Sequence, residues 1–315
     1  MSVEAALPSY AWKCNGVILT FIVPAFEGCD LTCSYCFIRQ RGEDNLVSSL
    51  KVSDFSCFIQ QVIYSHQIAS VCIQGYEPLL PDSFPYTRAI LSTGQWLNIP
   101  TSLVTNGTHL AQWVDELAVL APGRISVSLD AAEAEEHDRQ RRKAGAFAST
   151  VKGLRRAATA LPESTELVVT SVLMPKRRAQ LDDMPALLRD IGIKRWVVTA
   201  LQKVGKDRPG GPVGEREKIL ADLRILRDHA EAAGIDFKVD DEFNGLADAS
   251  GGASGGKPDE FEKNRIRRLV DPDGVYRLVP DGRCSKGADI LKPLSDKTPR
   301  WDPKTQDAAA FLATL

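Results

Sequence analysis

Three cysteines within eight residues carry the clearest chemical signal in the chain. Cys29, Cys33 and Cys36 form a C-x3-C-x2-C run directly after an apolar, strand-like segment. Thiolates bind soft or borderline metals, and iron–sulfur clusters are held by cysteine ligands. Three thiolates in one short loop can hold three irons of a cubane and leave the fourth iron open, as a catalytic metal site requires. We therefore expect these cysteines to ligate a [4Fe–4S] cluster.

Zinc is the main alternative for the same three thiols. A structural zinc site normally needs four protein ligands, so a remote residue such as Cys14 or a histidine would have to supply the fourth. A non-catalytic zinc- or cluster-binding module on an α/β scaffold therefore stays open as an alternative to an enzyme. The zinc form of such a module would be a colourless protein.

Composition and charge bound the class of protein but not its substrate. The 315 residues are 43% hydrophobic and 25% charged, which suits one large α/β domain with an extension. A formal net charge of -2 gives no basic field for a phosphate backbone, which argues against a nucleic-acid partner. The apolar run Val17–Phe26 is too short to span a bilayer, and no export signal is visible. We expect a cytoplasmic protein with no membrane partner.

Strand-like apolar runs alternate with amphipathic helical stretches over the first two thirds of the chain. The expected strands are Val17–Val23, Ser70–Gln74, Thr101–Val104, Arg124–Leu129, Leu167–Leu173 and Trp196–Leu201. The expected helices are Ser53–His66, Ser83–Leu97, Ala111–Leu120, Phe147–Ala160, Leu181–Asp190 and Glu215–Ala233, with Ser53 and Ser83 at N-cap positions. Six strand–helix units predict an α/β fold with a parallel sheet, either doubly wound or a partial (β/α)6 barrel.

The pattern changes after Ala233. Ile235–Val239 is expected to form one more strand, and Ala247–Lys257, which is rich in glycine and serine, a flexible loop or linker. Two Asp-Gly turn signals bracket Val275–Val279, which predicts a small hairpin.

Polar motifs follow the expected strands at their carboxyl ends, where loops build the site in both candidate folds. Backbone carbonyls and a carboxylate can accept hydrogen bonds from an ammonium group, and a guanidinium offers a carboxylate a bidentate fork. Alternation along a strand places Ser126, Ser128 and Asp130 on one face. The motifs are Gln74-Gly75-Tyr76-Glu77-Pro78, Thr105-Asn106-Gly107-Thr108, Ser126-Val127-Ser128-Leu129-Asp130 and His137-Asp138-Arg139-Gln140-Arg141.

Together with the three cysteines and Tyr35 before the last of them, these motifs resemble the radical S-adenosylmethionine (SAM) superfamily, in the family's order from about Val17 to Gly205. The resemblance implies a partial (β/α)6 TIM-like barrel. It also implies that the open iron chelates SAM, whose reductive cleavage gives a 5′-deoxyadenosyl radical that abstracts hydrogen from substrate. In the family this chemistry belongs to the cofactor, while the protein positions it and excludes water.

The same resemblance implies roles for individual side chains around SAM. Gly75, Tyr76, Glu77 and Pro78 look like the family's Gly-Gly-Glu-Pro motif, which binds the methionine amino group, although Tyr76 replaces the second glycine. Arg141 is the implied partner of the SAM carboxylate, with Arg139 and Arg142 close by. The remaining implied contacts are Thr105 and Asn106 lining the cavity, Ser126, Ser128 and Asp130 near the ribose and substrate, and Val172, Leu173 and Leu201 near adenine.

The C-terminal third adds few candidates. We expect a lead-in over residues 1–12, a barrel over 13–205, and an extension over 206–315 that covers the barrel mouth. Cys284 lies in that extension, where its thiol could return a hydrogen atom to a substrate radical. It is the sole cysteine of that third, which argues against the auxiliary clusters of many peptide-modifying relatives.

The sequence leaves the substrate open. A small molecule or a peptide fits, with a flavodoxin or ferredoxin as electron donor. The basic stretch Arg265–Arg268 keeps an RNA-modifying enzyme as an alternative. A degenerate member of the family, motivated by Tyr76, would hold the cluster without turnover.

Overall fold

Strands and helices alternate through most of the part of the chain that the computed structural model describes. That part comprises residues 17–21, 28–36, 52–53, 68–74, 76–201, 214–239, 267–270, 276–279 and 300–301. The strands are β1 (Val17–Phe21), β2 (Ile68–Ile73), β3 (Thr101–Thr105), β4 (Arg124–Ser128), β5 (Glu166–Leu173), β6 (Arg195–Ala200), β7 (Asp236–Val239), β8 (Arg267–Val270), β9 (Tyr276–Val279) and β10 (Arg300–Trp301). The helices are α3 (Phe84–Trp96), α4 (Leu110–Leu120), α5 (Ala134–Arg141), α6 (Ala146–Ala160), α7 (Met184–Ile191) and α8 (Arg216–Ala232), with a 3-10 turn at Arg178–Leu181.

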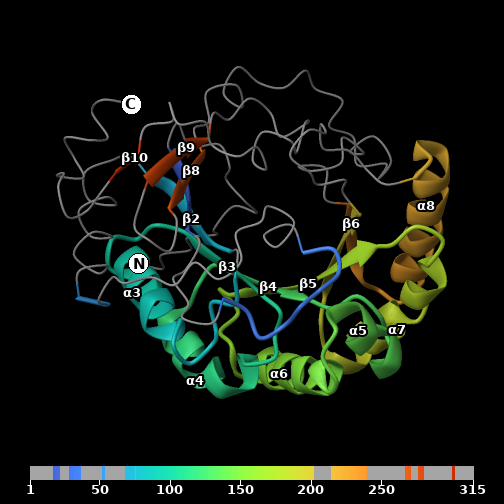
Figure 1. Cartoon of the computed structure of the whole chain (residues 1–315). Coiled ribbons are helices and arrows are strands. Elements are labelled where there is room, and N and C mark those ends of the chain that lie inside the picture. The colour runs from blue at the N-terminus through green and yellow to red at the C-terminus, as the bar shows by residue number, and fades with distance from the viewer. Residues whose placement is uncertain are drawn as a thin grey trace, which may run out of the picture.

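All ten of these strands belong to one sheet, in the order β10-β9-β8-β1-β2-β3-β4-β5-β6-β7. Neighbours from β1 to β7 pair in parallel, as expected for successive strand–helix units. The sheet bends into an open arc with the helices on its outer side (Figure 1), which confirms the α/β partial barrel. The extra strand expected at Ile235–Val239 is β7. The expected hairpin is confirmed in its pairing, because β9 runs antiparallel to β8.

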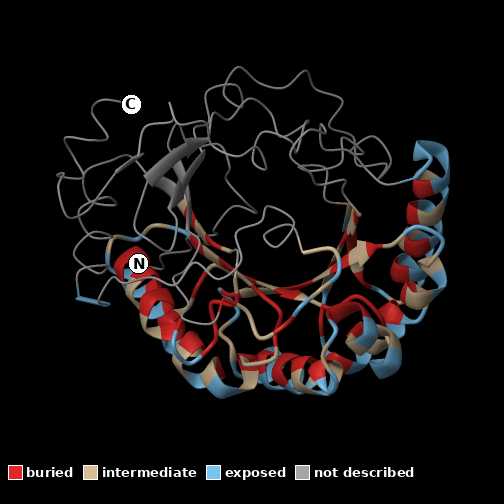
Figure 2. Cartoon of the chain, in the orientation of Figure 1, coloured by how far each residue is buried: buried red, intermediate tan, exposed pale blue. Residues whose placement is uncertain are grey.

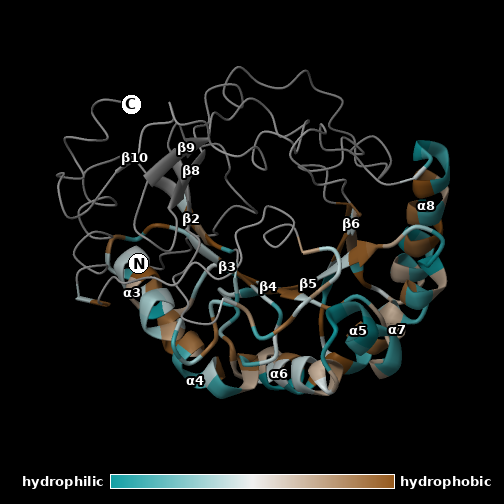
Figure 3. Ribbon diagram, viewed as in Figure 1, coloured by the Kyte–Doolittle hydropathy of each residue, from teal (hydrophilic) through white to brown (hydrophobic). Residues whose placement is uncertain are grey.

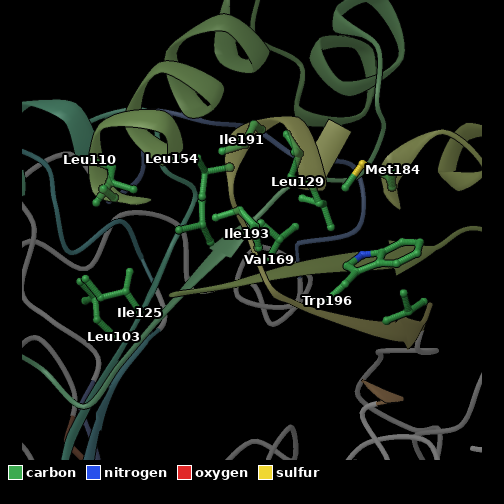
Figure 4. Packing of buried hydrophobic residues seen from close by; sticks show 14 of the residues in the cluster. Leu103, Leu110, Ile125, Leu129, Leu154, Val169, Met184, Ile191, Ile193 and Trp196 are labelled. Carbon is green, nitrogen blue, oxygen red and sulfur yellow. The ribbon is translucent and has the colours of Figure 1, made fainter. Parts of the chain in front are cut away.

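The core lies between the sheet and the outer helices. Strand residues alternate between buried and half-buried, as in β6, and the buried set faces the helices. Figure 2 shows this buried layer, and Figure 3 shows the hydrophilic outer sides of the helices. Figure 4 shows Leu103, Ile125 and Val169 of three adjacent strands beside helix residues that include Leu110 and Leu154. The alternate strand side chains face the other, concave side of the arc, where they can contribute to a binding site.

Helix α5 is missing from the sequence-based expectation. Its buried residues are His137, Gln140 and Arg141, whereas pattern reading looks for buried apolar residues. The expected helix Leu181–Asp190 instead begins later, as α7 at Met184, and Leu181 is the last residue of the preceding 3-10 turn. Pro185 lies at the start of α7, where its missing N–H costs no helical hydrogen bond.

Ser83 occupies the N-cap position of α3, but its side chain makes no capping hydrogen bond. Its hydroxyl oxygen is buried and has no hydrogen-bond partner among the residues described. Backbone turns and a proline in the first turn therefore start α3 rather than a side-chain cap.

Several expectations fall outside the described residues. These are Gly75, Cys14, Cys57, Cys284, the helix Ser53–His66 beyond Ser53, and the segment Ala247–Lys257. Within the described part, no helix combines the length and apolar character needed to cross a membrane.

Candidate active site

The cysteine loop, residues 28–36, lies against the segments that follow β2 and β4. The Glu77 amide donates to the carbonyl oxygen of Gly28 at 3.2 Å, and the Thr32 amide donates to the carbonyl oxygen of Arg141 at 3.4 Å. Parallel strands all present their carboxyl ends at one edge of the sheet, so motifs that are distant in sequence meet there. The polar motifs and the three cysteines therefore share one edge of the arc.

Asp30 fixes the first half of the cysteine loop. Its Oδ1 accepts a hydrogen bond from Asn106 Nδ2 at 2.8 Å, and its Oδ2 accepts one from Thr108 Oγ1 at 2.9 Å. Lys143 Nζ lies 2.7 Å and His109 Nε2 lies 3.5 Å from the same Oδ2. Burial alone would raise the pKa of Asp30, but these four donors hold it well below its usual range. Asp30 is therefore an ionised clamp between the loop, the end of β3 and the segment after α5.

Tyr35, Asp130 and Arg141 fix the second half of the loop. The Tyr35 hydroxyl donates to Asp130 Oδ2, and Arg141 Nη2 lies 2.7 Å from that oxygen. The Val172 amide donates to Asp130 Oδ1 at 2.9 Å, and Arg141 Cζ lies 5.6 Å from the centre of the Tyr35 ring. Burial raises the pKa of Tyr35. Burial alone would lower the pKa of Arg141, but Asp130, Tyr35 and Cys33 together raise it. A buried ion pair thus anchors the loop to β4 and β5.

The thiols of the loop sit among hydrogen-bond donors. Cys29 Sγ accepts from the Leu31 amide at 3.4 Å and from Asn106 Nδ2 at 3.7 Å. Burial, with a smaller contribution from the charge of Glu77, raises the pKa of Cys29 to about 12. Burial also raises the pKa of Cys33. Without a metal the Cys29 and Cys33 thiols hold their protons, so a bound cation must supply the energy that forms these two thiolates.

Glu77 lies next to the cysteine loop, where its amide contacts Gly28, and its side chain is almost fully buried. Its Oε1 accepts from the Leu79 amide at 2.9 Å and from Thr105 Oγ1 at 2.6 Å, while its Oε2 accepts from the Asn106 amide at 2.7 Å. Burial raises the pKa of Glu77 to about 7 despite these donors. The next residue, Pro78, is also buried. The carboxylate therefore joins the turn after β2 to the turn after β3.

Gly107 makes the turn after β3 possible. Its φ of +82° belongs to the left-handed region, and a Cβ there would lie 2.7 Å from side-chain carbons of both Thr150 and Val127. Thr150 Oγ1 donates to the carbonyl oxygen of Asn106 at 3.0 Å. The Asn-Gly pair therefore has a structural reason, which is to turn Asn106 back over Cys29 and Asp30.

Ser126 and Ser128 lie on the concave side of β4. They alternate with the buried core residues Ile125 and Val127, which face the helices. Ser126 Oγ lies 2.6 Å from Thr170 Oγ1 of β5, so the two hydroxyls share a hydrogen bond. The polar face expected from alternation is present for the two serines. Asp130 follows the end of β4 and turns to the cysteine loop instead.

The residues assigned to adenine divide between the two sides of the sheet. Leu173 belongs to the buried core cluster, whereas Val172 and Leu201 are half-buried. The end of β5 is apolar on both sides, so the sequence pattern could not tell which residue faces the core. Tyr76, at the position of the second glycine of the family motif, is half-buried, and Gly75 lies outside the described residues.

Sequence reasoning missed three residues of the site. Asp30 lies inside the cysteine motif but was treated as a spacer, and His109 and Lys143 follow motifs that were assigned without them. Lys143 and Asp30 are 113 positions apart and meet only in the folded chain. An acidic residue between two cysteines was the one available signal. Such a residue carries a charge, and the folded loop must place a cation or other donors next to it.

The residues at this edge fit a cluster and SAM. Arg141 Nε and His137 Nε2 are buried and have no hydrogen-bond partner among the described residues. His137 Nδ1 accepts from the Asp130 amide at 3.2 Å, and burial lowers the pKa of His137 to about 4, so its Nε2 carries the proton. Both atoms are donors, and Arg141 also contacts the cysteine loop at Cys33, which suits an anionic group there.

No group of three or more His, Cys, Asp or Glu side chains in the described part is arranged to hold a single metal ion. A cubane does not need such convergence, because each of three cysteines binds a different iron. Three thiols, a cationic guanidinium and unpaired donors at one edge therefore agree with the chemistry expected of this loop.

Comparisons with known proteins give the family. A family model described as the radical SAM superfamily matches residues 23–191. The AdoMet-dependent heme synthase of Methanosarcina barkeri is 34% identical over 130 residues, which are 40% of this chain and 35% of that protein. The probable GTP 3′,8-cyclase of Methanococcus maripaludis is 30% identical over 140 residues, 44% of this chain and 45% of that protein. Each match thus spans less than half of the curated relative.

A likeness to solved structures agrees in fold. Streptococcus suis SuiB, bound to precursor peptide SuiA, superimposes with a TM-score of 0.64 at 16% identity, covering 93% of this chain and 64% of SuiB. At that identity the likeness concerns the fold alone. The family model, by contrast, matches more than half of the 315 residues and includes all three cysteines. The chain therefore belongs to the radical SAM superfamily, whose enzymes use a [4Fe–4S] cluster and S-adenosylmethionine.

Proposed function

We propose that this chain holds a [4Fe–4S] cluster on Cys29, Cys33 and Cys36, binds SAM beside it and abstracts hydrogen from an organic substrate on the concave side of the sheet. The observation that supports this most directly is the cysteine loop itself, which is held at the carboxyl edge of the strands at two points. Asp30 pairs with Lys143, and the Tyr35 hydroxyl donates to Asp130, which forms a buried ion pair with Arg141. When bound, the cluster and SAM supply a 5′-deoxyadenosyl radical as the hydrogen-abstracting group.

The protein's own side chains would bind SAM and orient it. Arg141 has an unpaired Nε donor, which would bind the SAM carboxylate without giving up the contact of its Nη2 with Asp130. Glu77 holds the turn after β2 against Asn106, so the backbone of that turn stays oriented toward the methionine amino group. Tyr35 closes the space between the loop and Asp130, which helps to exclude water.

The substrate belongs on the concave face, where Ser126, Ser128, Thr170 and Thr199 present short side chains with hydroxyl groups. Hydroxyls of this size suit a polar substrate that hydrogen-bonds along the strands. Both a small molecule and a peptide meet that description. The names of the two curated relatives indicate small-molecule chemistry, and SuiB was solved with a peptide. A flavodoxin or ferredoxin is the proposed electron donor.

The test is formation of 5′-deoxyadenosine from SAM by anaerobically reconstituted, reduced protein. We expect wild type to form it and Cys36→Ala to form none, because the variant lacks one ligand of the cluster. Cys57→Ala removes a thiol outside the motif and is the matched control, with wild-type iron content expected. Iron and sulfide analysis accompanies each assay.

Two results would contradict the proposal. Zinc in place of iron and sulfide would make the chain a zinc-binding module. An intact cluster that gives no 5′-deoxyadenosine, with or without a panel of small-molecule and peptide substrates, would make it a degenerate member of its family.

A further inference from the structure

One cysteine of the loop has a charged hydrogen-bond donor. Arg141 Nη1 donates to Cys33 Sγ at 3.8 Å, while Arg141 Nη2 lies 2.7 Å from Asp130 Oδ2. The guanidinium therefore stands between a ligand sulfur and a carboxylate. Cys29 differs, since its sulfur accepts from a backbone amide and from the neutral side chain of Asn106.

Burial makes these charges effective. The Arg141 side chain is 9% exposed and the Asp130 side chain 0%. Salt screens charges in solvent over about 10 Å at 0.1 M, but it screens buried pairs much less. In a medium of low effective dielectric constant, each of the two charges acts on a group bonded to Cys33 more strongly than a surface charge would.

The sign of each effect follows from charge. One-electron reduction adds a negative charge to a cluster, so a nearby cation stabilises the reduced form and raises the reduction potential. A nearby anion has the opposite effect. Hydrogen bonds to the sulfurs and buried charge are among the factors that set such potentials. Arg141 therefore raises the reduction potential. Asp130, which contacts the other nitrogen of the guanidinium, lowers it.

We infer that the Arg141–Asp130 pair sets the reduction potential of the cluster through Cys33. The inference rests on the proposed function, because it needs the cluster on the three cysteines. In this view the pair is a positioning and tuning device: Asp130 holds the guanidinium at the sulfur and offsets part of its charge. A low-potential one-electron reductant such as dithionite supplies the electron, and no bond is made or broken in the step.

The test is a reductive titration of the reconstituted full chain, without SAM, followed by electron paramagnetic resonance. We expect a more negative midpoint potential for Arg141→Gln and a more positive one for Asp130→Asn. Arg141→Lys keeps the charge but loses the planar fork, so its potential should fall between those of Arg141→Gln and wild type. Arg155→Gln is the matched control, because it removes the same charge from an ion pair with Asp190 on the outer helices, half-exposed to solvent.

The outcomes separate the inference from the proposed function. Shifts of opposite sign in the Arg141 and Asp130 variants, with Arg155→Gln unchanged, support the inference. Shifts of the same sign, or shifts no larger than that of Arg155→Gln, overturn it while the cluster assignment stands. Where Arg141→Gln fails to hold the cluster, Arg141→Lys and Asp130→Asn still give the two signs. A wild-type protein that binds no four-iron cluster overturns both.

Discussion

Three carboxylates at the carboxyl edge of the sheet differ in how they are paired. Asp30 and Asp130 each contact a cation, at Lys143 and Arg141, whereas the donors to Glu77 among the described residues are all uncharged. A buried carboxylate without a cation favours the protonated form, which is why burial raises the pKa of Glu77 to about 7. The three carboxylates therefore respond differently to substitution.

Glu77→Gln tests this difference through pH. A folded-state pKa raised above the unfolded value means that Glu77 contributes most to stability at low pH, and that this contribution is lost as pH rises through about 7. Wild type should lose up to about 3 kcal/mol of unfolding free energy relative to Glu77→Gln between pH 4.5 and pH 8. Urea unfolding of the metal-free protein across that range measures the difference, and parallel curves for the two proteins would contradict the prediction.

Asp30→Asn tests the clamp on the loop. The amide keeps one acceptor but loses the charge that pairs with Lys143, so the loop should lose its fixed position and bind the cluster about 10- to 100-fold more weakly. Iron retained per chain during a chelator challenge gives the readout. Asp115→Asn, in an exposed ion pair with Arg156, is the control and should retain iron as wild type does. Equal iron retention in Asp30→Asn and Asp115→Asn would show that Asp30 does not hold the cysteine loop in place.

At the scale of elements, close helix packing supports the turn after β3. Gly153 of α6 allows α6 to approach α4, because a Cβ there would lie 2.9 Å from Leu110 Cβ, and 3.2 Å from both the Ala111 amide nitrogen and the Gly107 carbonyl oxygen. Two of these neighbours are backbone atoms and cannot move aside by rotation. The packing of α6 on α4 thus reaches the turn that carries Asn106.

Gly153→Ala should therefore destabilise the protein although alanine favours helix. The helix propensity gain is about 1 kcal/mol, and overpacking a tight contact costs about 1–3 kcal/mol, so we expect a net loss. Gly123→Ala is the matched control, because its added Cβ would meet the Thr101 carbonyl oxygen at an ordinary 3.4 Å. Thermal unfolding midpoints of both variants decide the matter, and a stabilised Gly153→Ala would show that α4 and α6 have room to separate.

At the scale of the whole molecule, the two edges of the sheet have different roles. The edge opposite the cysteines, at the amino ends of the strands, holds a chain of ion pairs that joins four successive strands. Arg124 of β4 pairs with Glu166 of β5, Arg195 of β6 pairs with Glu166, and Arg195 also pairs with Asp236 of β7. The candidate site residues lie at the carboxyl edge, and this ion-pair network joins the strands at the opposite edge.

Arg195→Gln removes the central cation of that network. The side chains are about a quarter to two fifths exposed, so solvent screening limits the loss to about 1 kcal/mol of unfolding free energy, and the difference should shrink in high salt. Arg227→Gln is the control, since Arg227 is similarly exposed but pairs only within α8 among the ion pairs found. A loss no larger in Arg195→Gln than in Arg227→Gln would show that the network adds nothing to the sheet.

The sequence alone determined the plan of the fold and predicted the chemistry of the loop. Cysteine spacing indicates a three-thiolate cluster because ligand type and loop length are local properties. Alternating apolar runs indicate a parallel sheet, and parallel strands must end at one edge, so the motifs after the strands were expected together. The strands β1 to β6 lie within two residues of their expected bounds for the same reason.

Only the tertiary structure decided which side chains pair. Asp130 and Arg141 were both assigned to SAM, yet they contact each other and the cysteine loop. Helix α5 stayed hidden because its buried face is polar, and a polar residue is read as exposed until its partner is known. The partner of Asp30 lies 113 positions away. Such pairings depend on how loops from different strands meet, which no local pattern specifies.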